Sequence, residues 1–356
     1  MRSLPEDGGR RTEVGGRRSE GRGQRAEGRR RRAERKNMTS NTFLRFIAIF
    51  CIANSHLDAL YPVPLLATGG SIGNALFFML SGYGLFLSAN IQDKPFLPWY
   101  KRRILRIYPS TWLATILMIV IVQSAWRTLD FFGYVRLFVW PTDYWFISAL
   151  MIYYVIFYVL MRRQNYKYFL VGIFILVLPY LYFYLTVVDL SFYSIEGPAS
   201  GYFKCIFYLQ TMFFGGYLAG CGRAGQPNFF KDGLALVLFV GLYYGILFFM
   251  SKFGGFQYQA VTHLLMFPIL FFFLRFAESK EITALVQSKY VGPVIALMAT
   301  LTLEIYLLHG YVRAFPFALK TIFPLNLVVF WVVTIALSFV LNRISGVLIK
   351  VGQRVK

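Results

Sequence analysis

The sequence predicts an all-α, polytopic integral membrane protein with about ten transmembrane helices and both termini in the cytoplasm. Of its 356 residues, 57% are hydrophobic and 19% are aromatic, whereas only 15% are charged. A soluble domain of this size rarely has so apolar a composition. The charged residues cluster between apolar runs of about twenty residues, which is the length that a helix needs to cross a bilayer.

The connections between these runs are short, so we expect one transmembrane domain over residues 38–356 and no sizeable soluble domain. Outside the N-terminal tail, 17 lysines and arginines lie in the segments assigned to the cytoplasm and 6 in the outward segments. This bias supports an even number of spans with both termini inside. The expected spans are residues 42–62, 71–90, 108–126, 143–161, 168–187, 201–221, 232–250, 258–275, 291–312 and 325–345.

Residues 1–37 precede the first span and form a basic tail in which Arg-[Thr/Ser/Ala]-Glu recurs every seven residues. A coiled coil would need apolar seam positions at this period, and the tail has none. We therefore expect disorder. The tail could bind anionic lipid. Alternatively, the repeat is a translated tandem DNA repeat and the native start is Met38, which is the interpretation we favour.

The first span contains two ionisable residues, Arg45 and His56, which are costly in lipid. They are eleven residues apart, about 1,100° along a helix, so they are expected on one face and about 16 Å apart in height. That face should look into the helix bundle, with Arg45 at the cytoplasmic mouth. A neutral histidine there could act as a general base or as a nucleophile. Alternatively, Arg45 snorkels to the interface and His56 only bonds a neighbouring helix.

The segment WYKRRILRIYP, residues 99–109, is the second candidate. Arg103 and Arg106 are three residues apart and would share one face of a short helix, where they could bind phosphate. Pro109 is expected in the first turn of the following span. The alternative is that the cluster is only a positive-inside signal.

Two later spans contain further candidates. Ser81 lies in GNALFFMLSGYGLF, whose small residues mainly indicate close helix packing. Glu304 and His309 lie in TLTLEIYLLHGYVR, about 140° apart around the helix. A glutamate inside a membrane span needs a partner, and the candidates for Glu304 are Arg45, His56 or a water-filled cavity. His309 could instead lie simply at the membrane interface.

The remaining histidine and the cysteines give no sign of a metal site. His263 has no companion motif, and we expect it to be a hydrogen-bonded histidine at the membrane interface. No HxxxH, HExxH or CxxC pattern occurs, so the sequence predicts no metal cofactor. The three cysteines are expected to be small buried apolar side chains. The net charge of +21 would suggest nucleic acid in a soluble protein, but here no nucleic-acid partner is expected.

Taken together and in order, these motifs resemble those of membrane acyltransferase family 3. The first span has an Arg and a His separated by ten residues, Arg45 and His56. FFMLSGYGLF is similar to the family's LFFxLSGF, and RRILRIYP to its RRxxRIYP, with Arg103 and Arg106 as the Arg-x-x-Arg pair. YWFISALMIYY and LEIYLLHGY resemble the family's WFL and SYEIYLLH segments. The resemblance covers about residues 40–345.

The resemblance also shows departures. Thr302-Leu303 replaces the family's Ser-Tyr, and Asn74 stands where an aliphatic residue is commoner. We expected no fused second domain after the last span, so the resemblance is to the stand-alone members.

The resemblance implies an O-acyltransferase in the inner (cytoplasmic) membrane. Acyl-CoA, most often acetyl-CoA, would donate the acyl group to a hydroxyl of a cell-surface oligosaccharide or polysaccharide, often lipid-linked. His56 would be the base or acyl relay, with Arg45 on the same face, and Arg103 and Arg106 would hold the CoA phosphates or shape the cytoplasmic entry. We add Glu304 to the catalytic candidates. The substrate-site candidates are His309 and Ser81.

Two other functions remain compatible with the sequence. A transporter or flippase of a glycan or lipid-linked intermediate would also use buried ionisable residues and glycine-broken helices. However, no paired half-repeats are evident. A membrane scaffold that binds lipids through the basic tail would leave Arg45 and His56 unexplained.

Overall fold

The structure is a computed structural model, and every regular element among the residues it describes is helical, which confirms the all-α class. The predicted basic tail, residues 1–37, lies outside the described residues, and its disorder stays a prediction. The described residues are 38–88, 95–122, 130–140, 144–163, 165–197, 200, 203–222, 226–315 and 322–354.

The elements follow the chain from a first helix at residues 38–54 to a long C-terminal helix. The short 3-10 helices are η1 (Asp58–Leu60), η2 (Pro64–Leu66) and η5 (Phe256–Tyr258). The α-helices that follow the first are α2 (Gly70–Leu87), α3 (Phe96–Val122), α4 (Phe131–Phe138), α5 (Trp145–Met161), α6 (Lys167–Thr186), α7 (Phe203–Cys221), α8 (Phe229–Phe253), α9 (Ala260–Ala277), α10 (Lys280–Val286), α11 (Val291–Thr300), α12 (Thr302–Val312) and α14 (Leu325–Arg354).

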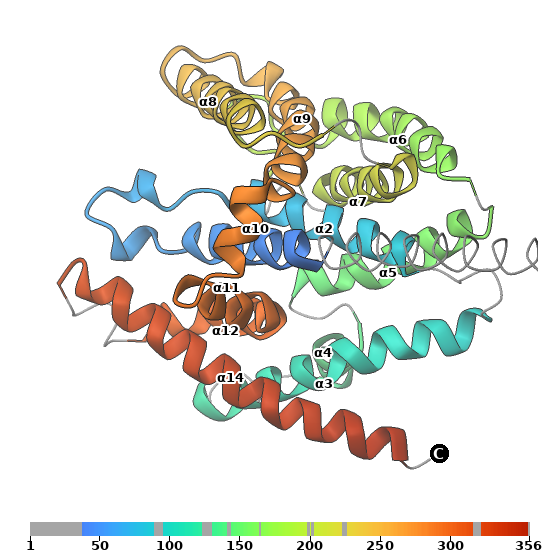
Figure 1. The fold of residues 1–356 in the computed structure, drawn as a ribbon, viewed down its shortest axis with the longest axis vertical. Helices are drawn as coiled ribbons and strands as arrows, with labels where there is room; N and C mark the ends of the chain where they lie inside the picture. The colour runs from blue at the N-terminus through green and yellow to red at the C-terminus, as the bar shows by residue number, and fades with distance from the viewer. Residues whose placement is uncertain are drawn as a thin grey trace, which may run out of the picture.

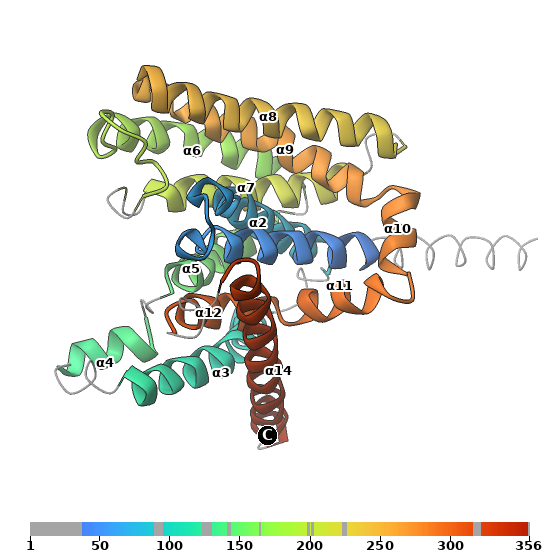
Figure 2. The same cartoon turned by 90° about the vertical axis from the view of Figure 1, so that its left-hand side faces the viewer.

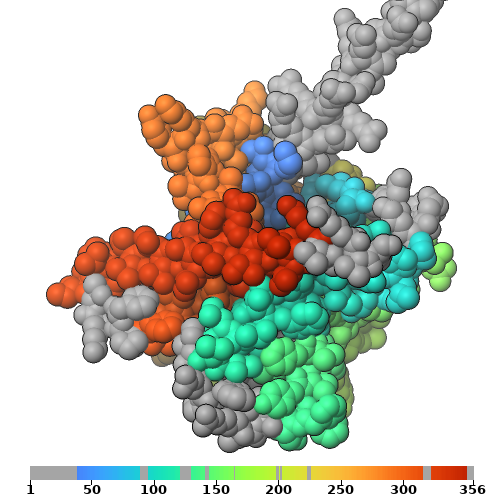
Figure 3. Space-filling model, turned by 90° about the horizontal axis from the view of Figure 1, so that it is seen from below, coloured from blue at the N-terminus to red at the C-terminus, as the bar shows by residue number. Residues whose placement is uncertain are grey.

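The helices form two groups around α2. On one side α2 packs against α7, which packs against α6, and α8 packs against α9 (Figure 1). On the other side α12, α14 and α3 contact one another. Figure 2 shows that α14 crosses the long axes of α8, α9 and the first helix steeply. Figure 3 shows α14 spread across one face of the molecule, beside α3.

The α2–α7 contact is the most extensive helix packing in the described fold, and glycine makes it possible. A Cβ atom on Gly82 would lie 1.9 Å from the backbone oxygen of Met212. A Cβ atom on Gly215 would lie 1.9 Å from the backbone oxygen of Met79. The two helices therefore touch backbone to backbone through reciprocal glycines, as small residues allow in membrane proteins.

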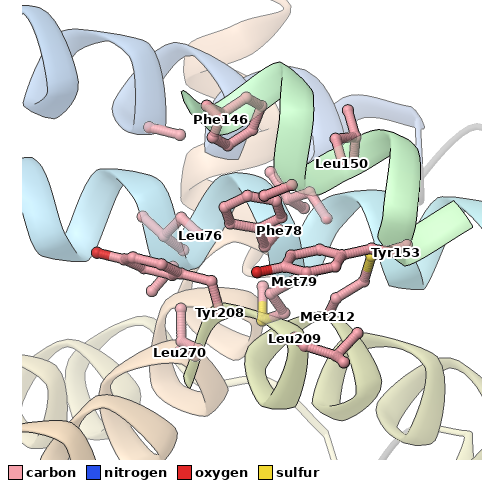
Figure 4. Close-up of a cluster of buried hydrophobic side chains, with 14 of the residues drawn as sticks. Leu76, Phe78, Met79, Phe146, Leu150, Tyr153, Tyr208, Leu209, Met212 and Leu270 are labelled. Atoms are coloured by element: carbon pink, nitrogen blue, oxygen red, sulfur yellow. The ribbon is translucent and has the colours of Figure 1, made fainter. Parts of the chain in front are cut away.

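Aromatic side chains fill the core between α2, α5 and α7 (Figure 4). The ring of Phe78 lies 5.3 Å from that of Tyr208 on α7 and 4.3 Å from that of Phe146 on α5. Phe78 and Tyr208 are completely buried. This core fixes α2 against α5 and α7, the elements that carry part of the candidate site described below.

Six helical segments among the described residues are long and apolar enough to cross a membrane, or seven if the bent α10–α11 pair counts as one span. This supports a polytopic membrane protein. The number of ten spans and the cytoplasmic location of both termini stay predictions. The six segments are Pro64–Leu87, Phe96–Val120, Lys167–Thr186, Phe229–Phe253, Phe256–Ala277 and Leu325–Lys350.

The expected short helix at residues 99–109 and the span expected from residue 108 form one continuous helix, α3, as far as Val122; residues 123–126 lie outside the described residues. Pro109 therefore lies inside α3, and the prediction that it stands in the first turn of a helix is wrong. An interior proline removes one backbone hydrogen bond, but membrane helices tolerate this where neighbouring groups compensate. The arginines of the basic segment consequently belong to the membrane helix itself.

The expected span at residues 291–312 is broken into α11 and α12 at Leu301. The hydroxyl of Thr302 donates a 2.7 Å hydrogen bond to the carbonyl oxygen of Ala299. The hydroxyl of Thr300 bonds the carbonyl oxygen of Ala296 in the same way, at 2.7 Å. Such side-chain bonds to the preceding turn bend helices, which is a physical reason for the break.

Candidate active site

His56 lies just beyond the end of the first helix, in an exposed turn. The backbone N–H of Ser55 still donates to the carbonyl oxygen of Cys51, four residues earlier, as in an α-helix. The N–H of His56 donates to the carbonyl oxygen of Ala53, only three residues earlier, so the backbone is more tightly wound there. The tightening coincides with Asn54, whose amide Nδ2 donates to the carbonyl oxygens of two loop residues, Leu66 at 2.9 Å and Thr68 at 3.0 Å. The prediction that Arg45 and His56 share one face of a continuous helix is therefore wrong, because the helix ends between them.

His309 on α12 is buried, and one of its ring nitrogens is anchored to its own helix. Nδ1 lies 3.1 Å from the carbonyl oxygen of Ile305 and 2.8 Å from that of Tyr306. Both partners are acceptors only, so Nδ1 carries the proton and donates. In the neutral imidazole, Nε2 is then the nitrogen with the free lone pair.

The two histidines face each other. Their ring centroids are 5.0 Å apart, and the ring planes are inclined by 45°. Both rings line a cavity of about 270 Å³, together with Tyr144, Trp145 and Arg313. The structure thus brings His56 and His309 together, although they are far apart in the sequence.

A second cavity, of about 520 Å³, meets the first at His56. Ser55, Asn74 and Trp145 also line both cavities. The larger cavity is otherwise lined by aromatic and polar side chains, including those of Tyr193, Glu196, Lys204, Tyr243 and Tyr244. Its volume falls within the range of about 300–1,000 Å³ that small-molecule sites occupy.

The wall of the larger cavity is held by a buried polar network. One oxygen of Glu196 lies 3.0 Å from Nε2 of His263, and the other accepts a 2.8 Å hydrogen bond from Tyr208. Nδ1 of His263 lies 2.9 Å from the hydroxyl of Tyr180. The ring of Phe207 stacks on His263 at 3.7 Å. His263 is therefore a hydrogen-bonded buried residue, and it fixes an acidic group at the cavity.

Three arginines, one from the first helix and two from α3, gather around Tyr154 of α5. Arg45, Arg103 and Arg106 all interact electrostatically with Tyr154, and Arg45 and Arg106 also repel each other. The guanidinium of Arg103 lies over the rings of Trp99, at 5.4 Å, and Tyr154, at 5.9 Å. None of the three forms a salt bridge with a carboxylate of the described residues, and three cations so close together suit an anionic ligand such as a phosphate.

Glu304 lies elsewhere. It is buried, and its Oε1 accepts hydrogen bonds from the hydroxyl of Ser110 on α3, at 2.9 Å, and the amide of Asn342 on α14, at 3.1 Å. It lines neither histidine cavity. Its hydrogen-bond partners are therefore not the expected Arg45 or His56, and the contact joins α12 to α3 and α14.

Ser81, the other substrate-site candidate, also lies away from the two cavities. Its hydroxyl donates a 2.9 Å hydrogen bond to the carbonyl oxygen of Phe77, one turn earlier in α2. Neither cavity includes it among its lining residues. A role for Ser81 at the substrate stays a prediction.

Sequence reasoning missed several residues at the cavities. Arg313 is the last residue of TLTLEIYLLHGYVR, and it entered the sequence analysis only as one of the six basic residues on the outward side. Trp145 lies in the YWF segment and was noted only for its resemblance. Glu196 and Lys204 had no motif around them, although a carboxylate or an ammonium group beside apolar spans is itself a signal of function. No group of three or more potential metal ligands occurs among the described residues.

The described residues thus form a helical membrane bundle that brings together two facing histidines, a basic cluster and a polar aromatic cavity, the features of a membrane protein that binds ligands within its bundle. Comparison with known protein families gives the narrower assignment. The family 3 acyltransferase domain matches residues 42–343, so the chain belongs to this acyltransferase family. No curated protein and no solved structure matches the chain.

Proposed function

We propose that this acyltransferase moves an acyl group, most often acetyl, from acyl-CoA to a hydroxyl of a cell-surface oligosaccharide or polysaccharide, in the inner membrane. The observation that carries the proposal is the pair of cavities that meet at His56. One contains the facing histidine, and the other offers an aromatic, polar wall. Positioned imidazoles typically contribute about 10²–10⁴-fold to proton transfer.

The basic cluster supports acyl-CoA as the donor. Arg45 lies nine residues before Asn54, where the first helix ends and the turn of His56 begins, so a helical rise of about 1.5 Å per residue places Arg45 about 14 Å from that turn. A donor that reaches both must carry its phosphates far from its reactive carbonyl. Acyl-CoA has this form, because a long flexible arm joins its phosphates to the thioester.

The larger cavity supports a sugar acceptor. Trp145, Tyr193 and Tyr243 give it aromatic surface, and Glu196 and Lys204 give it charged groups. The ammonium group of Lys204 lies 4.6 Å from the ring of Trp145. Aromatic faces beside hydrogen-bonding groups suit a ring whose faces are apolar and whose rim carries hydroxyls. Lipid-linked acceptors would approach such a cavity from the membrane.

The test is acyl transfer by the purified protein. Wild-type protein in lipid vesicles receives radiolabelled acetyl-CoA and a glycan extract, beside His56→Gln and the exposed control Ser251→Ala on α8. We expect label in the glycan with the wild type and the control, and loss of at least about 100-fold with His56→Gln. A transporter or flippase would move glycan across the vesicle membrane without consuming acetyl-CoA, and that result would replace the proposal.

A further inference from the structure

The two facing histidines are held in different ways. Nδ1 of His309 is fixed by the carbonyl oxygens of Ile305 and Tyr306, and the residue is only 6% exposed. The His56 side chain lies in an exposed turn, and no hydrogen bond from the described residues fixes its ring. Its position is held through the backbone, because Nη1 of Arg313 donates a 2.7 Å hydrogen bond to its carbonyl oxygen.

Their places in the cavities differ as well. His56 lines both cavities, whereas His309 lines only the smaller one. A group that carries an acyl unit needs a free ring nitrogen and space on more than one side. A general base needs one tautomer and a fixed lone pair near the reacting hydroxyl. His56 has the free ring and the open surroundings that an acyl carrier needs. His309 has the fixed tautomer that a general base needs.

We propose that the two histidines divide the reaction: His56 carries the acyl group, and His309 is the general base for the acceptor hydroxyl. This inference rests on the proposed function, and it assigns a separate catalytic role to a second histidine.

In the first step a neutral ring nitrogen of His56 attacks the thioester carbon. A C–N bond forms, the C–S bond breaks, and CoA leaves as its thiolate. The acyl-imidazolium of His56 then carries the positive charge. The ring centroid distance of 5.0 Å keeps His309 within reach of a hydroxyl that approaches this acyl group.

In the second step the acceptor oxygen attacks the acyl carbon while Nε2 of His309 takes the hydroxyl proton. A C–O bond forms, the C–N bond to His56 breaks, and His56 returns to its neutral form. The proton on His309 passes to the CoA thiolate. The sum is thioester plus alcohol giving ester plus thiol, with no further reactant.

The two half-reactions can be measured separately. Exchange of radiolabelled CoA into acetyl-CoA, with no acceptor present, reports the first step alone. Transfer of labelled acetyl to the glycan extract reports both steps. The variant His309→Asn keeps an amide donor near the position of Nδ1, toward the carbonyl oxygens of Ile305 and Tyr306, and removes Nε2. The variant His309→Gln places an amide, which cannot accept the proton, near the position of Nε2.

We expect both His309 variants to keep exchange within about threefold of wild type and to lose glycan transfer by about 100-fold or more. His56→Gln should lose both reactions, and the exposed control Ser251→Ala neither. Size-exclusion profiles and thermal melts check folding, and because exchange is itself an activity, its retention shows an intact donor site.

Three results would overturn the inference. The first is equal loss of exchange and transfer in both His309 variants, and the second is unchanged transfer in either of them. The third is a wild-type protein that transfers acetyl to glycan but never exchanges CoA, which would exclude an acyl-His56 carrier and leave the proposed function intact. Absence of any acetyl transfer by the wild type would instead contradict the proposed function.

Discussion

Arg313, in the turn directly after α12, donates a 2.7 Å hydrogen bond from Nη1 to the backbone carbonyl oxygen of His56. The same nitrogen lies 3.5 Å from a carboxylate oxygen of Asp58. Through this contact the helix that carries His309 also holds the turn that carries His56. Arg313 is therefore a positioning residue for the pair of histidines.

Replacing Arg313 by alanine should lower kcat by about tenfold, because a hydrogen bond from a charged donor is typically worth about 1.5–3 kcal/mol and this side chain is partly exposed. Asp58→Asn should change kcat by less than about threefold, since the Asp58 side chain is 63% exposed and exposed ion pairs contribute about 0–1 kcal/mol. Steady-state kinetics with acetyl-CoA and glycan extract measure both. Arg313→Ala with wild-type kcat would show that the contact does not position His56.

Arg103 should bind the donor. Its guanidinium lies over Trp99 and Tyr154 and beside Arg106, so Arg103→Ala should weaken CoA binding by about tenfold or more without unfolding the protein. Arg103→Lys should restore little, because a lysine lacks the planar group that stacks on the rings. Titration calorimetry with CoA gives the affinities. Lys101→Ala, at an exposed position of the same helix, removes the same charge and should bind CoA normally. If Lys101→Ala weakens CoA binding as much as Arg103→Ala does, the effect comes from the loss of one positive charge and not from the position of Arg103.

Glu304 tests a different kind of role. Oε1 accepts from Ser110 and Asn342, and a glutamine in its place retains an acceptor oxygen of the same reach. We therefore expect Glu304→Gln to keep most activity and thermal stability. Glu304→Ala should lower the stability by about 1–3 kcal/mol, because two buried donors lose their partner. Thermal melts and acetyl transfer separate the cases. Loss of transfer in a stable Glu304→Gln protein would instead support a catalytic carboxylate.

The close contact of α2 and α7 should not tolerate a methyl group. In Gly215→Ala the new Cβ would lie 1.9 Å from the backbone oxygen of Met79, so one helix must move. We expect a fall in melting temperature in detergent and a loss of glycan transfer, because α2 carries cavity residues such as Asn74. Gly241→Ala on α8, where a Cβ would meet nothing within 4 Å, is the matched control. An unchanged melting temperature for Gly215→Ala would refute the tight packing.

The fold was predictable where apolar runs are uniform. Helices α5 and α6 begin and end within about two residues of the expected spans, because length and hydropathy define such helices. The breaks were not predictable from hydropathy. Between α11 and α12, the hydroxyl of Thr302 bonds the carbonyl oxygen of Ala299 where the helix is broken. The first helix ends at Asn54, whose side chain bonds a loop twelve to fourteen residues further along the chain.

The site was predictable only in part. The motifs pointed to His56 and to the arginine cluster, because ionisable residues are rare in membrane helices. The partner of His56 was not predictable, since a helical wheel describes one helix and the facing ring of His309 comes from another. Glu304 shows the converse. A buried carboxylate signals importance, but its partners Ser110 and Asn342 could only come from the packing of α3 and α14.

Asn74 departs from the aliphatic residue that is commoner at its position, and it lines both cavities beside His56. Its Oδ1 is buried and has no hydrogen-bond partner among the described residues. An unsatisfied buried oxygen costs the folded protein about 1–3 kcal/mol, which suggests that its partner arrives with the substrate. An acceptor hydroxyl could donate to this oxygen while the cavity is filled.

Asn74→Leu should therefore raise the KM for the glycan acceptor by about tenfold, while the melting temperature stays the same or rises. This combination is typical of a polar residue that is kept for function at the expense of stability. Exchange of labelled CoA without acceptor should stay near wild type, because the donor half-reaction needs no acceptor contact. A variant that melts earlier and loses exchange and transfer together would show that Asn74 supports the fold instead, through its interaction with Tyr208.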